Sequence, residues 1–165
     1  MPGSGKSTIG REVARRLGAP FADCDRAIEE RAGCSIARIF ERDGETVFRQ
    51  TESDVLAALV LDGPRVIATG GGAVLRADNR DVLRTQTACV YLNVPFDVLW
   101  KRLRRDRRRP LLQVPDAEAR LRELAAVREP LYRETAAIVV DTQGLPFDRV
   151  VDTIVERLGP SAAPA

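Results

Sequence analysis

The 165-residue sequence predicts a three-layer α/β fold, with helices covering both faces of a central parallel sheet. Segments that fit strands alternate with segments of helical periodicity, which is the pattern of this fold class. The strand segments are apolar throughout instead of at every second position, as in a sheet that is buried on both faces. No repeat or linker divides the chain, so we expect one domain over residues 1–158 and a loose tail over 159–165.

The first eight residues, MPGSGKST, have most of the spacing of a phosphate-binding loop. Its glycines leave room for successive backbone N–H groups to converge on an anion at the start of a helix. Lys6 is expected to reach the β- and γ-phosphates of a nucleotide, and Ser7 to bind Mg²⁺. The loop residues predicted to contact the nucleotide are Gly3, Ser4, Gly5, Lys6, Ser7 and Thr8.

Helical spacing of Ile9, Val13 and Leu17 predicts that a helix follows the loop, and Gly18 fits its C-terminal cap. The segment PFADCD, residues 20–25, then predicts a short strand, with Asp25 capping the next helix. Another short helix is expected from Ser35, and a turn at residues 43–44 separates it from a longer helix over 45–61.

Three more strands are predicted, over Val66–Thr69 and in the segments ACVYLNV and AAIVVD. The intervening helices are expected near residues 78–84, from Pro95 toward Arg105, and from Asp116 onward with a bend or break at Pro130. Apolar residues at helical intervals over 150–158 predict the last helix.

Composition excludes several function classes. The chain has no histidine, which removes Ser-His-Asp and Cys-His catalysis and histidine-ligated zinc. Its three cysteines lack metal-ligand spacing and fit reduced thiols. No apolar run approaches a membrane span of ~20 residues, and the N-terminus does not resemble a signal peptide. We therefore expect a cytosolic protein without a membrane partner.

Acidic and glycine residues follow two of the predicted strands. Asp23 and Asp25 lie at the carboxyl end of one strand, the edge where α/β sheets bind ligands. Two positions apart on an extended chain, they would point the same way, one toward hydrated Mg²⁺ and the other toward a substrate hydroxyl. As an alternative, they only cap a helix. After VIAT, Gly70, Gly71 and Gly72 permit a tight turn or the close approach of a small polar ligand.

Two features concern arginine. Arg49 and Glu52 are three positions apart on a predicted helix and can form an ion pair, which on an exposed surface contributes little. Residues 101–109, KRLRRDRRR, contain seven basic positions in nine and fit either a nucleic-acid patch or a mobile lid that carries arginine to phosphates. The net charge is only +2 and one aromatic residue lies nearby, so we favour the lid.

Together these blocks resemble the shikimate kinase family: PGSGKST, DCD, SIARIF and GE before FRQTE, TGGGAV, RRPLL and REPLY occur in order between Pro2 and Leu158. The resemblance implies a P-loop kinase fold with a mobile lid over about residues 104–115 and substrate-binding helices over about 25–61. It also implies transfer of the γ-phosphate of ATP to the 3-hydroxyl of shikimate, with ATP and Mg²⁺ required and a monomeric chain expected.

The resemblance also assigns roles to single residues. Asp25 matches the residue that contacts the substrate hydroxyls and is the candidate base, while Asp23, with Ser7, supports magnesium. Lys6 and Arg109 supply positive charge to the transferred phosphate, and Arg109 is the lid arginine. Arg102 matches an arginine that packs on adenine. The residues matching those that hold the shikimate ring and carboxylate are Arg49, Arg128, Gly70, Gly71 and Gly72.

One departure from the family pattern is at the N-terminus, where an apolar strand and the first glycine of the loop normally precede MPGSGKST. We expect Met1 to be an internal methionine of a longer natural chain, and the chain as written to bind ATP weakly. Two functions other than shikimate kinase are considered: another small-molecule kinase, such as a gluconate kinase, and a non-catalytic nucleotide- or metabolite-binding module.

Overall fold

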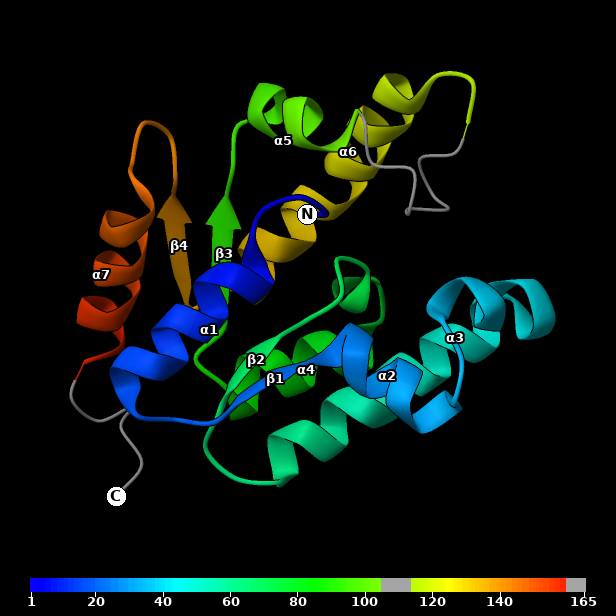
Figure 1. Cartoon of the computed structure of the whole chain (residues 1–165), viewed down its shortest axis with the longest axis horizontal. Helices are drawn as coiled ribbons and strands as arrows, with labels where there is room; N and C mark the ends of the chain where they lie inside the picture. Colours follow the sequence, from blue (N-terminus) through cyan, green and yellow to red (C-terminus); the bar gives the residue numbers. More distant parts are fainter. Residues whose placement is uncertain (105–113, 160–165) are drawn as a thin grey trace.

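The computed structural model describes residues 1–104 and 114–159 and confirms the α/β class (Figure 1). Helices and short strands alternate along the chain. In order, they are α1 (Lys6–Leu17), β1 (Phe21–Asp23), α2 (Cys24–Ala32), α3 (Ile36–Leu61), β2 (Val66–Ala68), the 3₁₀ helix η1 (Ala73–Leu75), α4 (Ala77–Gln86), β3 (Val90–Asn93), α5 (Phe96–Leu103), α6 (Ala117–Thr135), β4 (Ile138–Asp141) and α7 (Phe147–Leu158).

The strands form two parallel pairs, where we had expected one central sheet. In one pair β1 lies beside β2, with Phe21 opposite Val66, and in the other β3 lies beside β4, with Val90 opposite Ile138. Strands of one sheet lie about 4.8 Å apart. Within the described ranges, no strand lies between the β1–β2 pair and the β3–β4 pair at this spacing, so the two pairs are not joined into one sheet.

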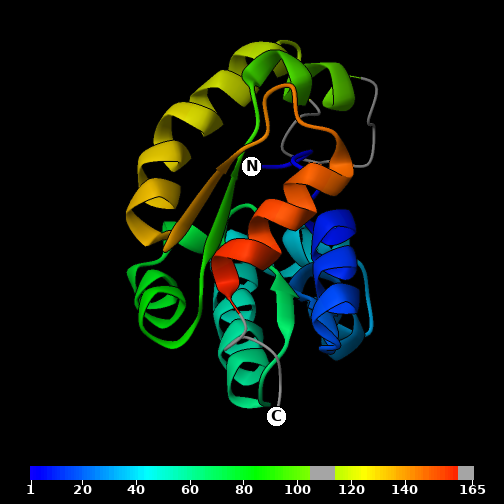
Figure 2. The same cartoon turned by 90° about the vertical axis from the view of Figure 1, so that its left-hand side faces the viewer.

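Helices cover the strands on two sides, so the expected layers are present. Figure 2 shows β3 and β4 between α6 on one side and α7 on the other. Helix α1 packs against β1, β2 and α7, and α6 packs against α4 and η1. The larger apolar core includes Val13, Leu92, Leu121, Val140 and Val151. A second core between α2 and α3 is formed by Ile28, Ile39, Phe48 and Val55.

Glycines end or bend the helices where the sequence predicted it. Gly18 caps α1 in the left-handed conformation, with φ 64° and ψ 22°. Gly44 interrupts α3 with φ 80° and ψ 174°, which places a kink at the predicted turn, and the helix continues on both sides of it.

One prediction about local structure was wrong, and another was wrong in part. Asp23, not Asp25, caps α2, because its carboxylate accepts hydrogen bonds from the backbone N–H groups of Asp25 and Arg26. Asp25 is therefore in the first turn of the helix. Of the bend or break expected at Pro130, the break is absent, since α6 runs through this residue, and the bend stays a prediction. A proline removes one hydrogen bond of the helix and crowds the carbonyl four residues before it, but buried Leu124 and Tyr132 on either side hold α6 against the core.

Parts of the predicted layout lie outside the described residues. These are most of the expected lid, including Arg109, and nearly all of the C-terminal tail. The boundaries of the predicted domain stay a prediction. In residues 1–104 and 114–159, no helix is both long enough and apolar enough to cross a bilayer.

Candidate active site

A cavity of about 1180 Å³ brings together the predicted site residues that the structure describes. It exceeds the ~300–1,000 Å³ typical of a pocket for one small ligand, so it has room for two. Its lining includes Gly3, Ser4, Gly5, Lys6, Ser7, Thr8, Asp23, Asp25, Arg49, Gly70, Gly71, Gly72, Arg102 and Arg128.

The phosphate-binding loop has the backbone that its glycines permit. Gly3 and Gly5 have φ of 73° and 85°, a region that other residues rarely adopt. Space is a second requirement at Gly3, because a Cβ atom there would stand 2.9 Å from the Leu103 side chain. Gly5 is the N-cap of α1 and contributes no side chain to it, so the positive end of the helix dipole faces the cavity.

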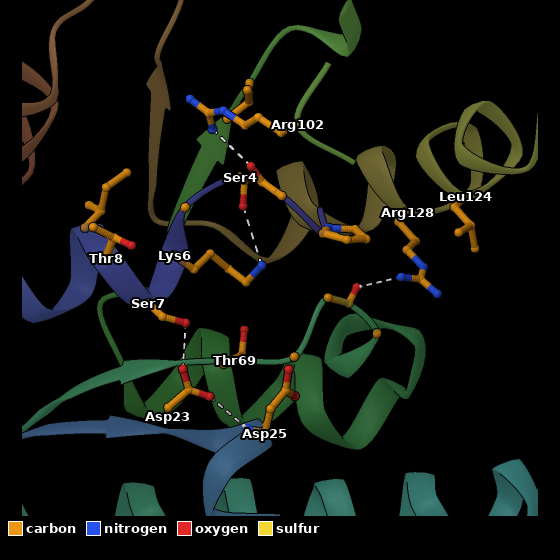
Figure 3. A pocket seen from close by; sticks show the side chains of 18 of the residues that line it. Ser4, Lys6, Ser7, Thr8, Asp23, Asp25, Thr69, Arg102, Leu124 and Arg128 are labelled. Atoms are coloured by element: carbon orange, nitrogen blue, oxygen red, sulfur yellow. Dashed lines mark hydrogen bonds between the residues drawn. The ribbon is translucent and has the colours of Figure 1, made fainter. Parts of the chain in front are cut away.

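Side chains of the loop make hydrogen bonds within and beside it (Figure 3). Lys6 Nζ donates to the Met1 carbonyl at 2.9 Å, and the buried Ser4 hydroxyl donates to the same oxygen at 2.8 Å. Arg102 Nη1 donates to the Gly3 carbonyl at 3.0 Å from α5. In Figure 3, Arg102 lies on the opposite side of the loop from Asp23 and Asp25.

The two carboxylate oxygens of Asp23 accept hydrogen bonds from different elements. One carboxylate oxygen caps α2, and the other accepts a hydrogen bond from the Ser7 hydroxyl at 2.6 Å. The strand β1 and the helix α1 are thereby joined at the cavity. Asp25 reaches the cavity from the first turn of α2, and the two carboxylates do not project from one strand as predicted.

Because the consecutive glycines lack side chains, charged side chains of the cavity can approach their backbone closely. A Cβ atom on Gly70 would stand 2.8 Å from Asp25 Oδ1 and 2.6 Å from Glu52 Oε1. On Gly72 it would overlap the Arg49 guanidinium. None of the three glycines has a positive φ, so the requirement is close approach and not an unusual backbone conformation.

The ion pair of Arg49 and Glu52 that their spacing predicted is present, and it is buried. Arg49 Nη1 lies 2.7 Å from Glu52 Oε2, and the side chains are 11% and 2% exposed. Burial raises the pKa of Glu52, and the hydrogen bond from Arg49 opposes that shift. Arg49 also contacts Glu45 at 3.1 Å, so two carboxylates fix the direction of its guanidinium.

Helix α6 presents Arg128 and Tyr132 to the glycine segment. The Gly71 carbonyl accepts hydrogen bonds from Arg128 Nη1 at 3.2 Å and from the Tyr132 hydroxyl at 2.5 Å. Arg128 is 4% exposed and lines the cavity. A buried cation beside a neutral carbonyl provides a favourable position for an anionic group of a substrate.

Cys24, between the two aspartates, has no catalytic character. The side chain is buried, and burial raises the pKa of its thiol to about 12. The thiol is therefore protonated at neutral pH, whereas the thiolate is the nucleophilic form.

Sequence reasoning missed part of the lining. Glu52, which lines the cavity, was seen only as a partner of Arg49, and Tyr132, which contacts the lining residue Gly71, only within the REPLY block. The spacing of Leu124, Arg128 and Tyr132 at i, i+4 and i+8 was the available signal for one buried face of α6. Lining residues that were not predicted also include Glu29, Ser35, Ile36, Phe40, Phe48, Thr69, Asp97, Thr142, Gln143, Leu145 and Phe147.

The fold and this cavity define a nucleotide-binding α/β protein with a phosphate-binding loop. The family model described as shikimate kinase matches residues 2–159. A shikimate kinase of Aromatoleum aromaticum is 51% identical over 141 residues, which are 86% of this chain and 81% of that protein. One from Pseudomonas aeruginosa strain LESB58 is 49% identical over 156 residues, 94% of this chain and 91% of that protein.

Solved structures agree with these sequence relatives. A shikimate kinase from Acinetobacter baumannii in complex with shikimate superimposes with a TM-score of 0.90 at 41% identity, covering 94% of this chain and 87% of that one. The shikimate kinase of Aquifex aeolicus gives a TM-score of 0.81 at 35% identity, over 98% and 94% of the chains. The chain belongs to the shikimate kinase family.

Proposed function

We propose that this chain transfers the γ-phosphoryl group of ATP to the 3-hydroxyl of shikimate, giving shikimate 3-phosphate and ADP. The observation that carries the proposal is that one cavity contains both a phosphate-binding loop and, beyond it, Asp25, Arg49 and Arg128. The Acinetobacter baumannii relative binds shikimate, which supports the same substrate for this chain.

The nucleotide occupies the end of the cavity formed by the loop. Backbone N–H groups at the start of α1 and the Lys6 ammonium bind its phosphates. Arg102 and the segment after β4, residues 142–147, line the same cavity and are available to the adenine and ribose.

Shikimate occupies the other end. Its carboxylate pairs with the guanidinium groups of Arg49 and Arg128, because planar forked donors match a carboxylate. Asp25 accepts the proton of the 3-hydroxyl while that oxygen bonds to the γ-phosphorus and the bond to the ADP oxygen breaks. Such a transfer depends more on positioned charge than on a strong base. Lys6 and, from outside the described residues, Arg109 supply that charge.

The residues present fit Mg²⁺. Ser7 Oγ and Asp23 Oδ2 lie 2.6 Å apart at the loop, and hard oxygen donors are what this ion prefers. Among the described residues no three His, Cys, Asp or Glu side chains form a complete metal site. Mg²⁺ commonly takes one or two protein ligands and completes its coordination with water and phosphate. When bound, it neutralises charge on the phosphates.

An assay of ADP release tests the function. With ATP and Mg²⁺, we expect ADP release that depends on shikimate and is absent with gluconate. Release with gluconate but not shikimate would favour another small-molecule kinase. ATP binding without release of ADP with either compound would favour a non-catalytic nucleotide-binding module. The cytosolic location and the monomeric state stay predictions from the sequence.

A further inference from the structure

We propose that Tyr132 is a positioning residue for the shikimate end of the cavity. Its hydroxyl fixes the Gly71 carbonyl and, through that carbonyl, the direction of the Arg128 guanidinium. The inference rests on the proposed function, because it assumes that Arg128 binds the substrate carboxylate.

The first part of the argument is a shared acceptor. Tyr132 and Arg128 are four positions apart on α6 and lie on its buried face. Both donate to the Gly71 carbonyl, the tyrosine at 2.5 Å and the arginine at 3.2 Å. Figure 3 shows Arg128 directed from α6 toward this segment. The shorter bond indicates that the tyrosine holds the carbonyl more firmly than the arginine does.

Tyr132 is itself held rigidly. The residue is 8% exposed, and its ring stacks on Tyr91 with centroids 5.1 Å apart and planes inclined by 22°. Burial raises the pKa of its hydroxyl to about 12, so the group is protonated and able to donate at neutral pH. A rigid donor of constant protonation suits a positioning role better than a catalytic one.

The Gly71 carbonyl is a sensitive point of the site. On one side of it, Gly70 contacts Asp25 and Glu52, and on the other, Gly72 contacts the Arg49 guanidinium. Neither contact leaves room for a Cβ atom. A rotation of the peptide at Gly71 would therefore disturb the surface on which the substrate-binding side chains pack.

The Gly71 carbonyl and the substrate carboxylate both accept hydrogen bonds from Arg128, and removal of the Tyr132 hydroxyl changes the balance between them. Without it, Arg128 is the remaining side-chain donor to Gly71 within the described residues. Because a buried acceptor that loses a partner is unfavourable, the guanidinium is drawn toward the carbonyl and away from the substrate carboxylate. The affinity for shikimate then falls, while the ATP end of the cavity is not affected.

The variant Tyr132→Phe tests this, since it keeps the stacked ring and removes only the hydroxyl. We expect KM for shikimate to rise about tenfold, the effect of one hydrogen bond, with kcat and KM for ATP changed by less than about twofold. Tyr91→Phe is the matched control, because its hydroxyl lies 3.4 Å from Asn93 Oδ1 and, within the described residues, makes no hydrogen bond to Gly71. We expect it to leave all three constants unchanged.

A double-mutant cycle with Arg128→Lys separates positioning from a general structural role. Lysine keeps the charge but not the fork, so Tyr132→Phe in that background is expected to change KM for shikimate by less than about twofold. Equal effects in both backgrounds would overturn the proposal. So would a parallel loss of shikimate and ATP affinity together with a lower Tm. Failure of the unmodified chain to release ADP with shikimate would instead refute the proposed function.

Discussion

Asp23 and Asp25 flank a buried cysteine, yet the chain gives them different environments. The carboxylate of Asp23 is occupied by the Ser7 hydroxyl and by the N-terminus of α2. Asp25 lies one residue into the helix and beside Gly70. In the proposed function, the change from strand to helix at Cys24 thus separates a carboxylate assigned to Mg²⁺ from one assigned to the substrate.

Asp25→Asn is expected to lower kcat by at least about 100-fold, the usual contribution of a positioned base. The Kd for ATP is expected to stay nearly constant, because the loop and α1 are untouched. Calorimetry with ATP and the ADP-release assay measure the two effects. Asp54→Asn, on the outer face of α3 beside Gln50, serves as the control. Equal loss of turnover and ATP affinity in Asp25→Asn would show that Asp25 is structural.

Glu52 gives the chain a pH-dependent contribution to stability. Burial raises its pKa in the folded protein above the ordinary value of 4.5. Between these two pKa values the folded state binds more protons than the unfolded state, so the contribution is complete below the lower pKa and is lost as pH rises through the higher one.

For Glu52→Gln, we therefore expect the wild type to be more stable relative to the variant at pH about 5 than at pH about 8. Urea unfolding at both pH values gives the free energies. Glu45→Gln is the matched control, because Glu45 contacts the same Arg49 from an exposed position, with its side chain 59% exposed. If the free energy of unfolding of the wild type, relative to that of Glu52→Gln, rose between pH about 5 and pH about 8, the argument would be contradicted.

Helix α3 is built from two segments that meet at Gly44. Ile36 and Phe40 from the first segment and Phe48 from the second line the same cavity. The rings of Phe40 and Phe48 lie with centroids 4.5 Å apart. The kink therefore brings apolar side chains from both segments together in the cavity lining, next to Arg49.

Gly44→Ala is expected to lower the free energy of unfolding by about 1–3 kcal/mol, because φ 80° with ψ 174° is a conformation that alanine avoids. Within the described residues no atom lies within 4 Å of the added Cβ, so a clash is not the cause. Urea unfolding measures the loss. Glu41→Ala, in the exposed first segment, is expected to change stability by less than about 0.5 kcal/mol. A neutral Gly44→Ala would mean that the kink is not required.

Local sequence signals predicted most of these elements, but not all of their ends. Gly18 and Gly44 mark backbone conformations that few residues adopt, so their positions could be read directly. The residue that caps α2 could not be identified from the sequence, because Asp23 and Asp25 are both good capping residues. Only the fold shows which of them reaches the free N–H groups. At Pro130, packing of α6 against the core overrides the local preference against helix.

The same limit applies to the site as a whole. The phosphate-binding loop is contiguous in sequence and could be predicted from it, and the roles assigned to its residues stay predictions. Glu52 and Tyr132 gain their importance from contacts with Gly70 and Gly71, which are distant along the chain. Burial in the folded protein distinguishes them from ordinary helix residues, and the spacing along α6 indicated that burial only for Tyr132.

The two parallel strand pairs divide the cavity into two functional ends. Asp25 and the three glycines follow β1 and β2, whereas Arg102 and residues 142–147 follow β3 and β4. Helix α6 follows β3 in sequence but reaches back to the first end through Arg128 and Tyr132. Shikimate is therefore expected to contact both parts of the molecule, through Asp25 and Arg49 on one side and Arg128 on the other.

Hydrogen exchange with each ligand alone tests this division. A ligand at 100 times its Kd slows exchange that requires its release by about 100-fold. Shikimate is expected to protect amides of residues 70–72 and of α6 around Arg128, and ATP to protect residues 3–8 and 142–147. The unliganded chain provides the reference, and residues 154–158 at the end of α7, none of which lines the cavity, provide an internal control. Protection of residues 142–147 by shikimate alone, with none in α6, would show that the two ends are assigned wrongly.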